Sequence, residues 1–259
     1  AGVTREISRA LPEEAAVAMV YDGGALAVMM ATPADLRDLA IGFSLGERII
    51  ERPEEIERLE VAAQENGVEA RMWLRADRSE TLRRRRRFMA GPVGCGLCGV
   101  DSLEAALRPL PRLAAAGPRL SGAEVEAAVA ALAGRQPLHD RTRAVHAAGF
   151  FRPGDGIVAA REDVGRHNAL DKLVGALALA GTDAAAGAIV ITSRISIEMV
   201  QKAVLAGATI LIAVSAPTAH AVRLAEAAGL TLVASARGGG FEIFAHPQRI
   251  GDGESCNVA

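Results

Sequence analysis

The chain has 259 residues, of which half are hydrophobic and only 3% are aromatic, and its formal net charge is −2. A net charge so close to zero gives no overall attraction to nucleic acid or to anionic lipid, so any anion must bind locally. The scarcity of aromatic rings argues against a surface that stacks single-stranded nucleic acid. We therefore expect neither nucleic acid nor a membrane among its partners.

The cysteine content and the apolar segments indicate a cytoplasmic protein. Three cysteines are too few for a disulfide scaffold, and no N-terminal stretch has the layout of a signal peptide. The most apolar tract, residues 203–217, is interrupted by glycine and threonine and is shorter than the roughly 18 residues that a membrane-spanning helix needs. It is better interpreted as the end of a helix followed by one buried strand.

The first third of the chain predicts a small α+β unit. Turn residues at 22–24 and 65–67 separate alternating segments, which predicts two hairpins. Between them, Thr32 followed by Pro33 predicts the start of a helix. A polar, arginine-rich stretch then leads to a pair of cysteines, and Asp101 with Glu104 resembles a capping box.

The rest of the chain predicts an α/β domain. Prolines make residues 109–118 a linker, and Ser121 with Glu124 forms a second capping box that opens a helix. From about Phe150, apolar strands alternate with amphipathic helices, the pattern of a mixed, mostly parallel sheet flanked by helices. We thus expect an N-terminal α+β subdomain at residues 1–110 and an α/β domain at residues 119–259. Strands are expected at 156–163, 188–194, 209–215, 230–236 and 241–246, with helices at 165–181, 196–208 and 216–229.

Cys95 and Cys98 form a C-x-x-C pair within the segment GPVGCGLCGV. A structural zinc site needs four ligands, but only Cys256 remains and no paired histidines are present. A zinc deaminase places H-x-E before its cysteines, whereas His146 follows them and lacks that glutamate. No metal site is expected. A dithiol oxidoreductase stays open, although the run before the pair does not resemble the buried strand that such a motif follows.

The same cysteines also fit sulfur chemistry. A thiolate is stabilised by nearby cations or a helix N-terminus, and the arginines at 83–87 and the helix expected from residue 102 offer both. Flanking glycines leave the sulfur accessible. Cys95 is therefore predicted to hold a persulfide, and Cys98 to help release the sulfur by forming a disulfide. An inert surface pair is the alternative.

Long segments of the sequence resemble the FdhD family of formate dehydrogenase accessory sulfurtransferases. They are TPADLRDLAIGF, CGLCG, REDVGRHNALDKLVG, TSRISIEMVQKA, SAPTAHAVRLAEAAG and ARGGGFEIFAHPQRI, in the order found in the family, and they extend from about residue 12 to residue 250. The resemblance implies a sulfurtransferase that receives persulfide sulfur from a cysteine desulfurase. It passes the sulfur to the molybdenum or tungsten bis(molybdopterin guanine dinucleotide) cofactor before that cofactor enters formate dehydrogenase.

The resemblance also implies site residues, a fold and an oligomeric state. Cys95 matches the persulfide-bearing cysteine of the family, and Cys98 matches the second cysteine. The implied fold is cytidine-deaminase-like without the zinc site, and the implied assembly is a homodimer. Two other functions stay open: a noncatalytic chaperone that binds a guanine nucleotide or the molybdenum cofactor, and a dithiol oxidoreductase.

The pyrophosphates of such a cofactor require backbone N–H groups at helix starts, a glycine turn and one or two arginines. Suitable residues follow three expected strands, and the resemblance matches the last segment, 235–240, to a stretch that contacts the cofactor; GDP should mimic the ligand. Isolated serines such as Ser196 and Ser215 also suit ordinary N-caps. The predicted cofactor-binding residues at strand ends are Ser193, Arg194, Ser215, Ser235, Ala236, Arg237, Gly238, Gly239 and Gly240.

His167 is a further candidate for this site. It lies four residues before Asp171, so the two share a helix face, and Asp163 lies one turn further back. The arrangement fits a histidine oriented for proton transfer, a metal ligand, or a structural hydrogen-bonded pair. We assign His167 to the cofactor site and interpret His146 as structural or pocket-lining.

Overall fold

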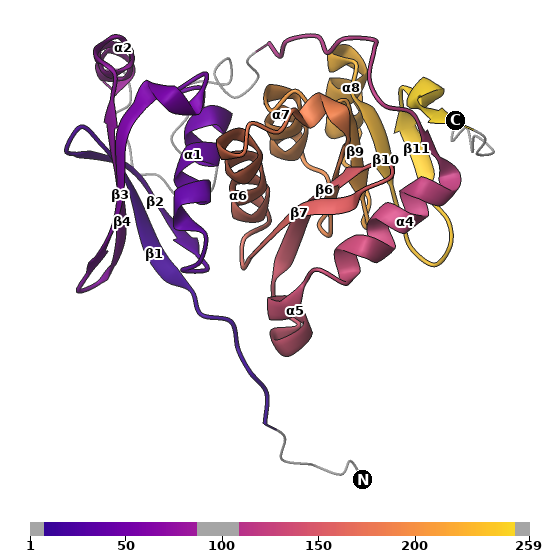
Figure 1. Ribbon diagram of the computed structural model, residues 1–259, viewed down its shortest axis with the longest axis horizontal. Helices are drawn as coiled ribbons and strands as arrows, with labels where there is room; N and C mark the ends of the chain where they lie inside the picture. The colour runs from indigo at the N-terminus through magenta and orange to yellow at the C-terminus, as the bar shows by residue number, and fades with distance from the viewer. Residues whose placement is uncertain (1–7, 87–108, 252–259) are drawn as a thin grey trace.

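A computed structural model describes residues 8–86 and 109–251 of the chain. Two sheets stand side by side, and the helices α1 (Leu36–Gly46) and α6 (Arg166–Leu179) pack against each other between them (Figure 1). Cys95, Cys98 and Cys256 lie outside the described residues.

Within residues 8–86, four strands form the N-terminal sheet, in the order β2-β1-β4-β3. Both expected hairpins are confirmed, and β1 and β4 lie side by side in parallel at the centre. Helix α1 packs its apolar residues on one face of this sheet, and Leu82 of α2 joins the same core. The elements are β1 (Ala15–Tyr21), β2 (Gly24–Ala31), the short 3-10 helix Pro53–Glu55, β3 (Ile56–Gln64), β4 (Gly67–Leu74) and α2 (Ala76–Arg86).

The helix expected to follow Thr32 begins at Leu36, and Thr32 is not its N-cap. The polar groups of Thr32 instead bind the second half of the chain. Its N–H donates to Asp163 at 3.0 Å, its Oγ1 accepts the Val164 N–H at 3.1 Å, and its carbonyl accepts the Lys172 ammonium at 2.9 Å. Tertiary contacts have therefore displaced the start of the helix by about one turn.

Within residues 109–251, six strands form the large sheet, in the order β11-β10-β9-β8-β6-β7. The expected mixed sheet is confirmed, although its described pairings comprise two parallel and three antiparallel ones, so it is not mostly parallel. The antiparallel pairings are those of β6 with β7, of β6 with β8 and of β10 with β11. The strands are β6 (His146–Arg152), β7 (Gly156–Asp163), β8 (Ala188–Ile191), β9 (Ile210–Ala213), β10 (Thr231–Ala234) and β11 (Glu242–Ala245).

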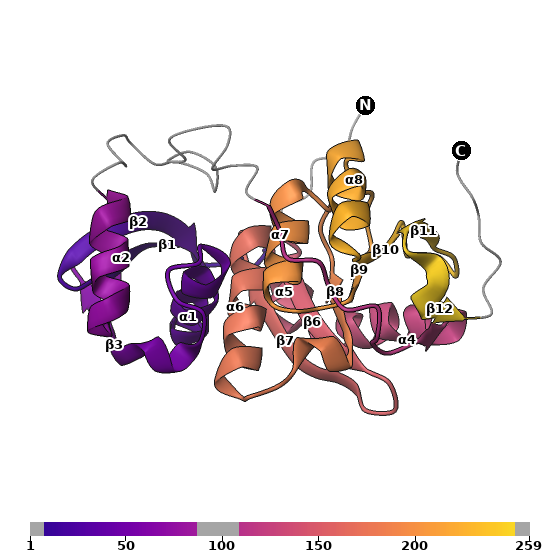
Figure 2. The same ribbon diagram turned by 90° about the horizontal axis from the view of Figure 1, so that it is seen from above.

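Helices cover both faces of the large sheet, as the alternating pattern predicted (Figure 2). One face packs on α6, α7 and α8, and the other packs on α4, whose capping box of Ser121 and Glu124 is confirmed. The linker at 109–118 contains no helix. The remaining elements are β5 (Leu120–Ser121), α4 (Gly122–Ala133), α5 (Pro137–Thr142), the 3-10 helix Ala184–Ala186, α7 (Ile197–Leu205), α8 (Ala219–Ala228), the 3-10 helix Pro247–Arg249 and β12 (Ile250–Gly251), which pairs with β5.

Two glycines allow α1 and α6 to touch through their backbones. A Cβ at Gly42 would lie 1.8 Å from the carbonyl oxygen of Asp171, and a Cβ at Gly175 would lie 1.9 Å from that of Asp38. No larger residue fits either position unless the helices move apart. This contact joins the regions predicted as separate subdomains, and the proposed boundaries stay a prediction.

A fully buried ion pair lies in the same junction. The Lys172 ammonium is 2.6 Å from Asp163 Oδ2, and neither side chain is exposed. Asp163 is the last residue of β7 and Lys172 lies on α6, so the pair fixes α6 to the edge of the large sheet. Among the described helices, none is both long enough and apolar enough to cross a membrane.

Candidate functional site

The three segments predicted to bind a cofactor lie together at one edge of the large sheet. They follow β8, β9 and β10, which are neighbouring parallel strands and therefore deliver their carboxyl ends to the same edge. Hydrogen bonds continue the sheet into these turns: Ile195 N–H donates to Ala216 O at 3.2 Å, and Ser235 N–H donates to Ser215 O at 3.2 Å. We call this region the strand-end site, comprising residues 192–196, 214–218 and 235–240.

The segment after β10 forms an open glycine turn. Ala236 is buried and its N–H donates to Ala213 O at 3.1 Å, whereas Arg237 is exposed and its N–H donates to Gly240 O at 3.1 Å. Gly238 and Gly239 have φ values of +65° and +81°, a region that favours glycine. A Cβ at either position would meet nothing within 4 Å. An exposed main chain beside an arginine is suited to phosphate oxygens.

The turn after β8 contributes a second exposed arginine. Ser193 is buried and its hydroxyl donates to Arg194 O at 3.1 Å, so its role is to shape the turn, whereas the Arg194 side chain is exposed. Ser196 is the N-cap residue of α7, but its hydroxyl donates to Glu198 at 2.5 Å and makes no capping hydrogen bond to the helix backbone. Ser215 is not a helix cap, because Thr218 caps α8.

His167 lies at the start of α6 and faces the first turn of α7. Its Nε2 is 3.9 Å from Glu198 Oε2, a distance that suits an ion pair but is too long for a hydrogen bond. This Nε2 is buried and has no hydrogen-bond partner among the described residues. His167, followed by the hydrogen bond from Ser196, lowers the pKa of Glu198 to about 2. Glu198 was missed from sequence because an acidic residue in a first helical turn is ordinary.

The two aspartates grouped with His167 in the sequence have structural partners instead. Asp171 accepts two hydrogen bonds from the Lys202 ammonium, at 2.7 and 2.9 Å, and Asp163 pairs with Lys172. Neither aspartate therefore forms the hydrogen-bonded pair with His167 that the spacing suggested, because each binds a lysine. Among the described residues, no group of three His, Cys, Asp or Glu side chains could hold a metal ion.

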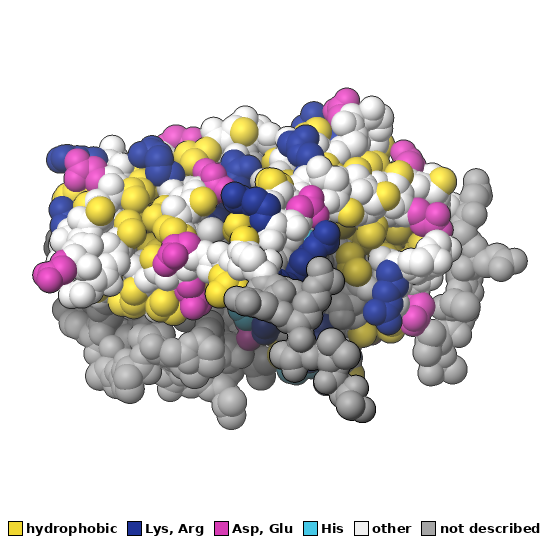
Figure 3. Space-filling model, turned by 90° about the horizontal axis from the view of Figure 1, so that it is seen from below, with side chains coloured by type: hydrophobic (Ala, Val, Ile, Leu, Met, Phe, Trp, Pro, Cys, Tyr) yellow, Lys and Arg dark blue, Asp and Glu magenta, His cyan; other side chains and the backbone are white. Residues whose placement is uncertain are grey.

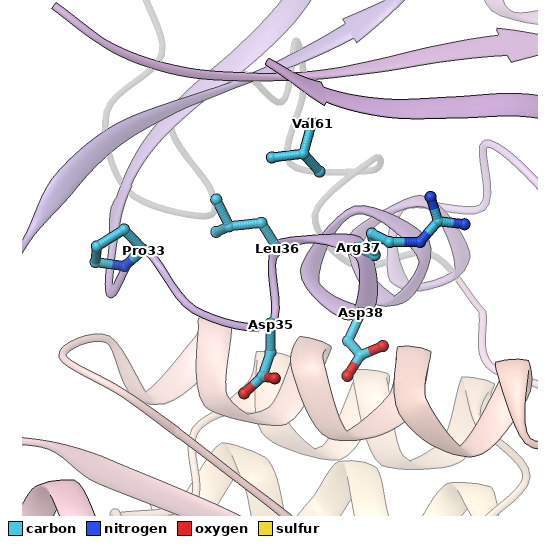
Figure 4. A pocket seen from close by; sticks show the side chains of 6 residues that line it. All are labelled: Pro33, Asp35, Leu36, Arg37, Asp38 and Val61. Carbon is cyan, nitrogen blue, oxygen red and sulfur yellow. The ribbon is translucent and has the colours of Figure 1, made fainter. Parts of the chain in front are cut away.

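Two hollows border the loop before α1, and residues of the strand-end site line neither of them. The first, of about 430 Å³, is lined by six residues, and Leu36 and Val61 face each other across it (Figure 4). The second, of about 390 Å³, lies between that loop, α5 and β7 and includes Arg135 and Arg141. Neither lining contains a residue predicted to bind the cofactor. The first hollow is lined by Pro33, Asp35, Leu36, Arg37, Asp38 and Val61.

On the face shown in Figure 3, Lys and Arg side chains are intermixed with Asp and Glu side chains and with hydrophobic ones, so this face carries no single large patch of positive charge. This distribution matches the net charge of −2. An anion at the strand-end site would therefore depend on local groups such as Arg194 and Arg237.

Comparison with known proteins shows the family of the chain. The family model described as FdhD/NarQ matches residues 12–251. The sulfur carrier protein FdhD of Agrobacterium fabrum is 52% identical over 242 residues, covering 93% of this chain and 89% of the relative. That of Brucella abortus is 56% identical over 246 residues, covering 95% and 91%.

A solved structure has the same fold. It is described as a putative formate dehydrogenase accessory protein from Desulfotalea psychrophila, and it superposes with a TM-score of 0.73 at 26% identity. The match covers 95% of this chain and 93% of that one. Sequence and fold agree over nearly the whole length, and the chain belongs to the FdhD/NarQ family.

Proposed function

We propose that the protein is a sulfur carrier that accepts persulfide sulfur from a cysteine desulfurase and transfers it to the molybdenum bis(molybdopterin guanine dinucleotide) cofactor needed for formate dehydrogenase activity. The observation that carries this proposal is identity above 50%, over more than 90% of the chain, to relatives named sulfur carrier protein FdhD. The protein acts as a sulfurtransferase in the cytoplasm, as a homodimer.

Loading requires a nucleophilic thiolate. The Cys95 thiolate attacks the terminal sulfur of the desulfurase persulfide, a new S–S bond forms at Cys95, and the old S–S bond breaks. The desulfurase cysteine leaves as a thiolate and takes up the proton that Cys95 lost. One sulfur atom moves at an unchanged oxidation state, so no external oxidant or reductant is needed.

Release as sulfide requires two electrons, and Cys98 supplies the second thiol. The Cys98 thiolate attacks the inner sulfur of the Cys95 persulfide, which forms a Cys95–Cys98 disulfide and expels hydrosulfide for the cofactor. The two cysteine sulfurs are oxidised as the departing sulfur is reduced. A dithiol reductant then restores the pair for the next cycle.

The strand-end site suits the proposed acceptor of the sulfur, the guanine dinucleotide cofactor. Its open glycine turn and the exposed Arg194 and Arg237 offer main-chain and guanidinium donors to the pyrophosphates of the guanine dinucleotide. The first turns of α7 and α8 begin at the same edge, where helix N-termini favour anions. These features support binding of the cofactor with its phosphates against the sheet edge.

Mass spectrometry tests the proposal directly. The protein is incubated with a cysteine desulfurase and cysteine, and the peptide that holds Cys95 should gain one sulfur atom. Cys95→Ala should abolish the gain, whereas Cys256→Ala, the matched control, should leave it unchanged. Cys98→Ala should load normally but release sulfide slowly.

Other outcomes would support the other two functions. An unmodified Cys95 in every condition would refute sulfur carrying and favour a noncatalytic cofactor chaperone. A Cys95–Cys98 disulfide as the sole product would favour a dithiol oxidoreductase.

A further inference from the structure

His146 is a titratable side chain at the border of the strand-end site that nothing above uses. It is the first residue of β6 and pairs with Asp163 of β7. Thr192 N–H donates to Ala147 O at 3.1 Å, which holds the start of β6 beside the turn after β8. Residues directly opposite in an antiparallel pair project on the same face, so His146 shares the face of the sheet on which Asp163 meets α6.

The imidazole of His146 is half-buried and has no hydrogen-bond partner among the described residues. The carboxylate of Asp163, opposite His146, can accept no further hydrogen bond. Oδ1 of Asp163 accepts hydrogen bonds from the Gly165 N–H at 2.8 Å and from Asn168 at 3.0 Å. Its Oδ2 accepts the Thr32 N–H and the Lys172 ammonium. With both oxygens occupied twice, Asp163 cannot also bind a protonated His146.

Apart from Asp163 of β7, the charged or titratable groups around His146 are cationic or can become so. They are His139 from α5, and Arg166 and His167 from α6. Beyond them, Glu198 of α7 already faces His167. Burial, followed by Arg166 and His139, lowers the pKa of His146. Among the described residues, therefore, no free carboxylate compensates a proton on His146.

We propose that His146 is a binding residue of the strand-end site that takes up a proton when a phosphate or pyrophosphate group binds there. The anion supplies the negative charge that the surrounding residues do not offer, and His146 becomes a charged donor to it. This inference rests on the proposed binding of a guanine dinucleotide at that edge. It adds to that function one ligand-binding residue and a dependence of the ligand affinity on pH.

Thermodynamic linkage determines how the affinity for the ligand changes with pH. A ligand that favours protonated His146 raises the pKa of that residue on binding, so the ligand binds more tightly below this pKa than above it. Each pKa unit of rise corresponds to about tenfold in affinity. We expect the affinity for GDP to fall about tenfold between about pH 5.5 and about pH 8 through this residue.

Calorimetry with GDP as the probe tests the proposal. Titrations near pH 6.5 in buffers of different ionisation enthalpy give the number of protons taken up on binding. The terminal phosphate of GDP titrates in the same range, so the informative quantity is the difference between the unmodified protein and His146→Gln. Proton uptake should be smaller in this variant, and its affinity for GDP should keep only the pH dependence that the phosphate of GDP itself contributes. His246→Gln is the matched control, because His246 is bound to Glu226 O through Nε2.

A second measurement uses the unmodified protein, so it does not require His146→Gln to fold. The imidazole resonances of the unmodified protein, followed by NMR against pH, should show one histidine whose pKa rises when GDP is added. Equal proton uptake in the protein and in His146→Gln, or no histidine shift, would overturn the proposal. Failure of GDP to bind would overturn it as well. None of these results bears on persulfide formation at Cys95, so loss of this inference is distinguishable from loss of the sulfur-carrying function.

Discussion

Replacing Lys172 by methionine is the most direct test of how the two sheets are held together. Methionine keeps an unbranched chain of similar length in the packed junction but removes the ammonium. Two interactions disappear, the 2.6 Å contact with Asp163 and the 2.9 Å hydrogen bond to Thr32 O. The carboxylate of Asp163 then stays fully buried without a cation.

The expected cost follows from burial and from the donors that remain. Breaking a buried ion pair by removing one partner typically costs about 3–5 kcal/mol. Asp163 keeps the N–H groups of Thr32 and Gly165 and the amide of Asn168, which stabilise its charge and place the cost near the lower end, about 3 kcal/mol. For a protein of this size, 1 kcal/mol shifts the Tm by about 2–4 °C, so a drop of about 6–12 °C is expected.

Urea denaturation of the purified protein measures this difference in the free energy of unfolding. Arg152→Gln provides the control, because it removes an exposed pair with Asp155 at 3.2 Å and should cost less than about 1 kcal/mol. The double variant Lys172→Met/Asp163→Asn removes both charges of this pair and should recover part of the loss. A cost for Lys172→Met no larger than that for Arg152→Gln would refute the reasoning.

Three further predictions concern single side chains. Gly42→Ala should destabilise the protein by about 3 kcal/mol despite the better helix propensity of alanine, because its Cβ would lie 1.8 Å from the Asp171 carbonyl; a stabilised variant in thermal unfolding would contradict the helix contact. Glu198→Gln should lower stability by about 1 kcal/mol at neutral pH after allowing for solvent screening. Because the folded pKa of Glu198 is lowered, this difference should vanish as the pH falls from about 4.5 towards about 2, and a constant difference in unfolding experiments across that range would argue against the pair with His167. Ser121→Ala removes the capping box of α4 and should cost about 1 kcal/mol by denaturation, whereas no loss would mean that packing alone fixes this helix end.

Local patterns predicted most elements because they act over a few residues. Ser121 and Glu124 are three residues apart, and their mutual hydrogen bonds form in the structure at that spacing. The strands that follow Gly187 and Gly207 are apolar runs of a kind that only a covered sheet can bury. Since parallel neighbours end at one edge, the shared location of the turns containing Arg194 and Arg237 was also predictable.

Long-range contacts account for the misses. Thr32 has the composition of an N-cap, but its partners lie more than 130 residues away, and no local pattern shows them. Helix α2 was not predicted because its arginines mask any apolar periodicity. His167 was grouped with Asp171 because of their spacing, yet the Asp171 carboxylate binds the ammonium of Lys202 on α7 instead. The partners of these polar side chains therefore depend on contacts between distant elements, which sequence spacing does not show.

The glycine contact between α1 and α6 has a consequence for how the molecule unfolds and moves. With main chain against main chain at Gly42 and Gly175, neither helix can roll or slide without breaking van der Waals contact along its length. The two sheets should unfold in one cooperative transition. Limited proteolysis should not yield a stable fragment that contains only one of the two sheets. Any protein that docks on this one would therefore contact a single rigid surface rather than two halves that move relative to each other.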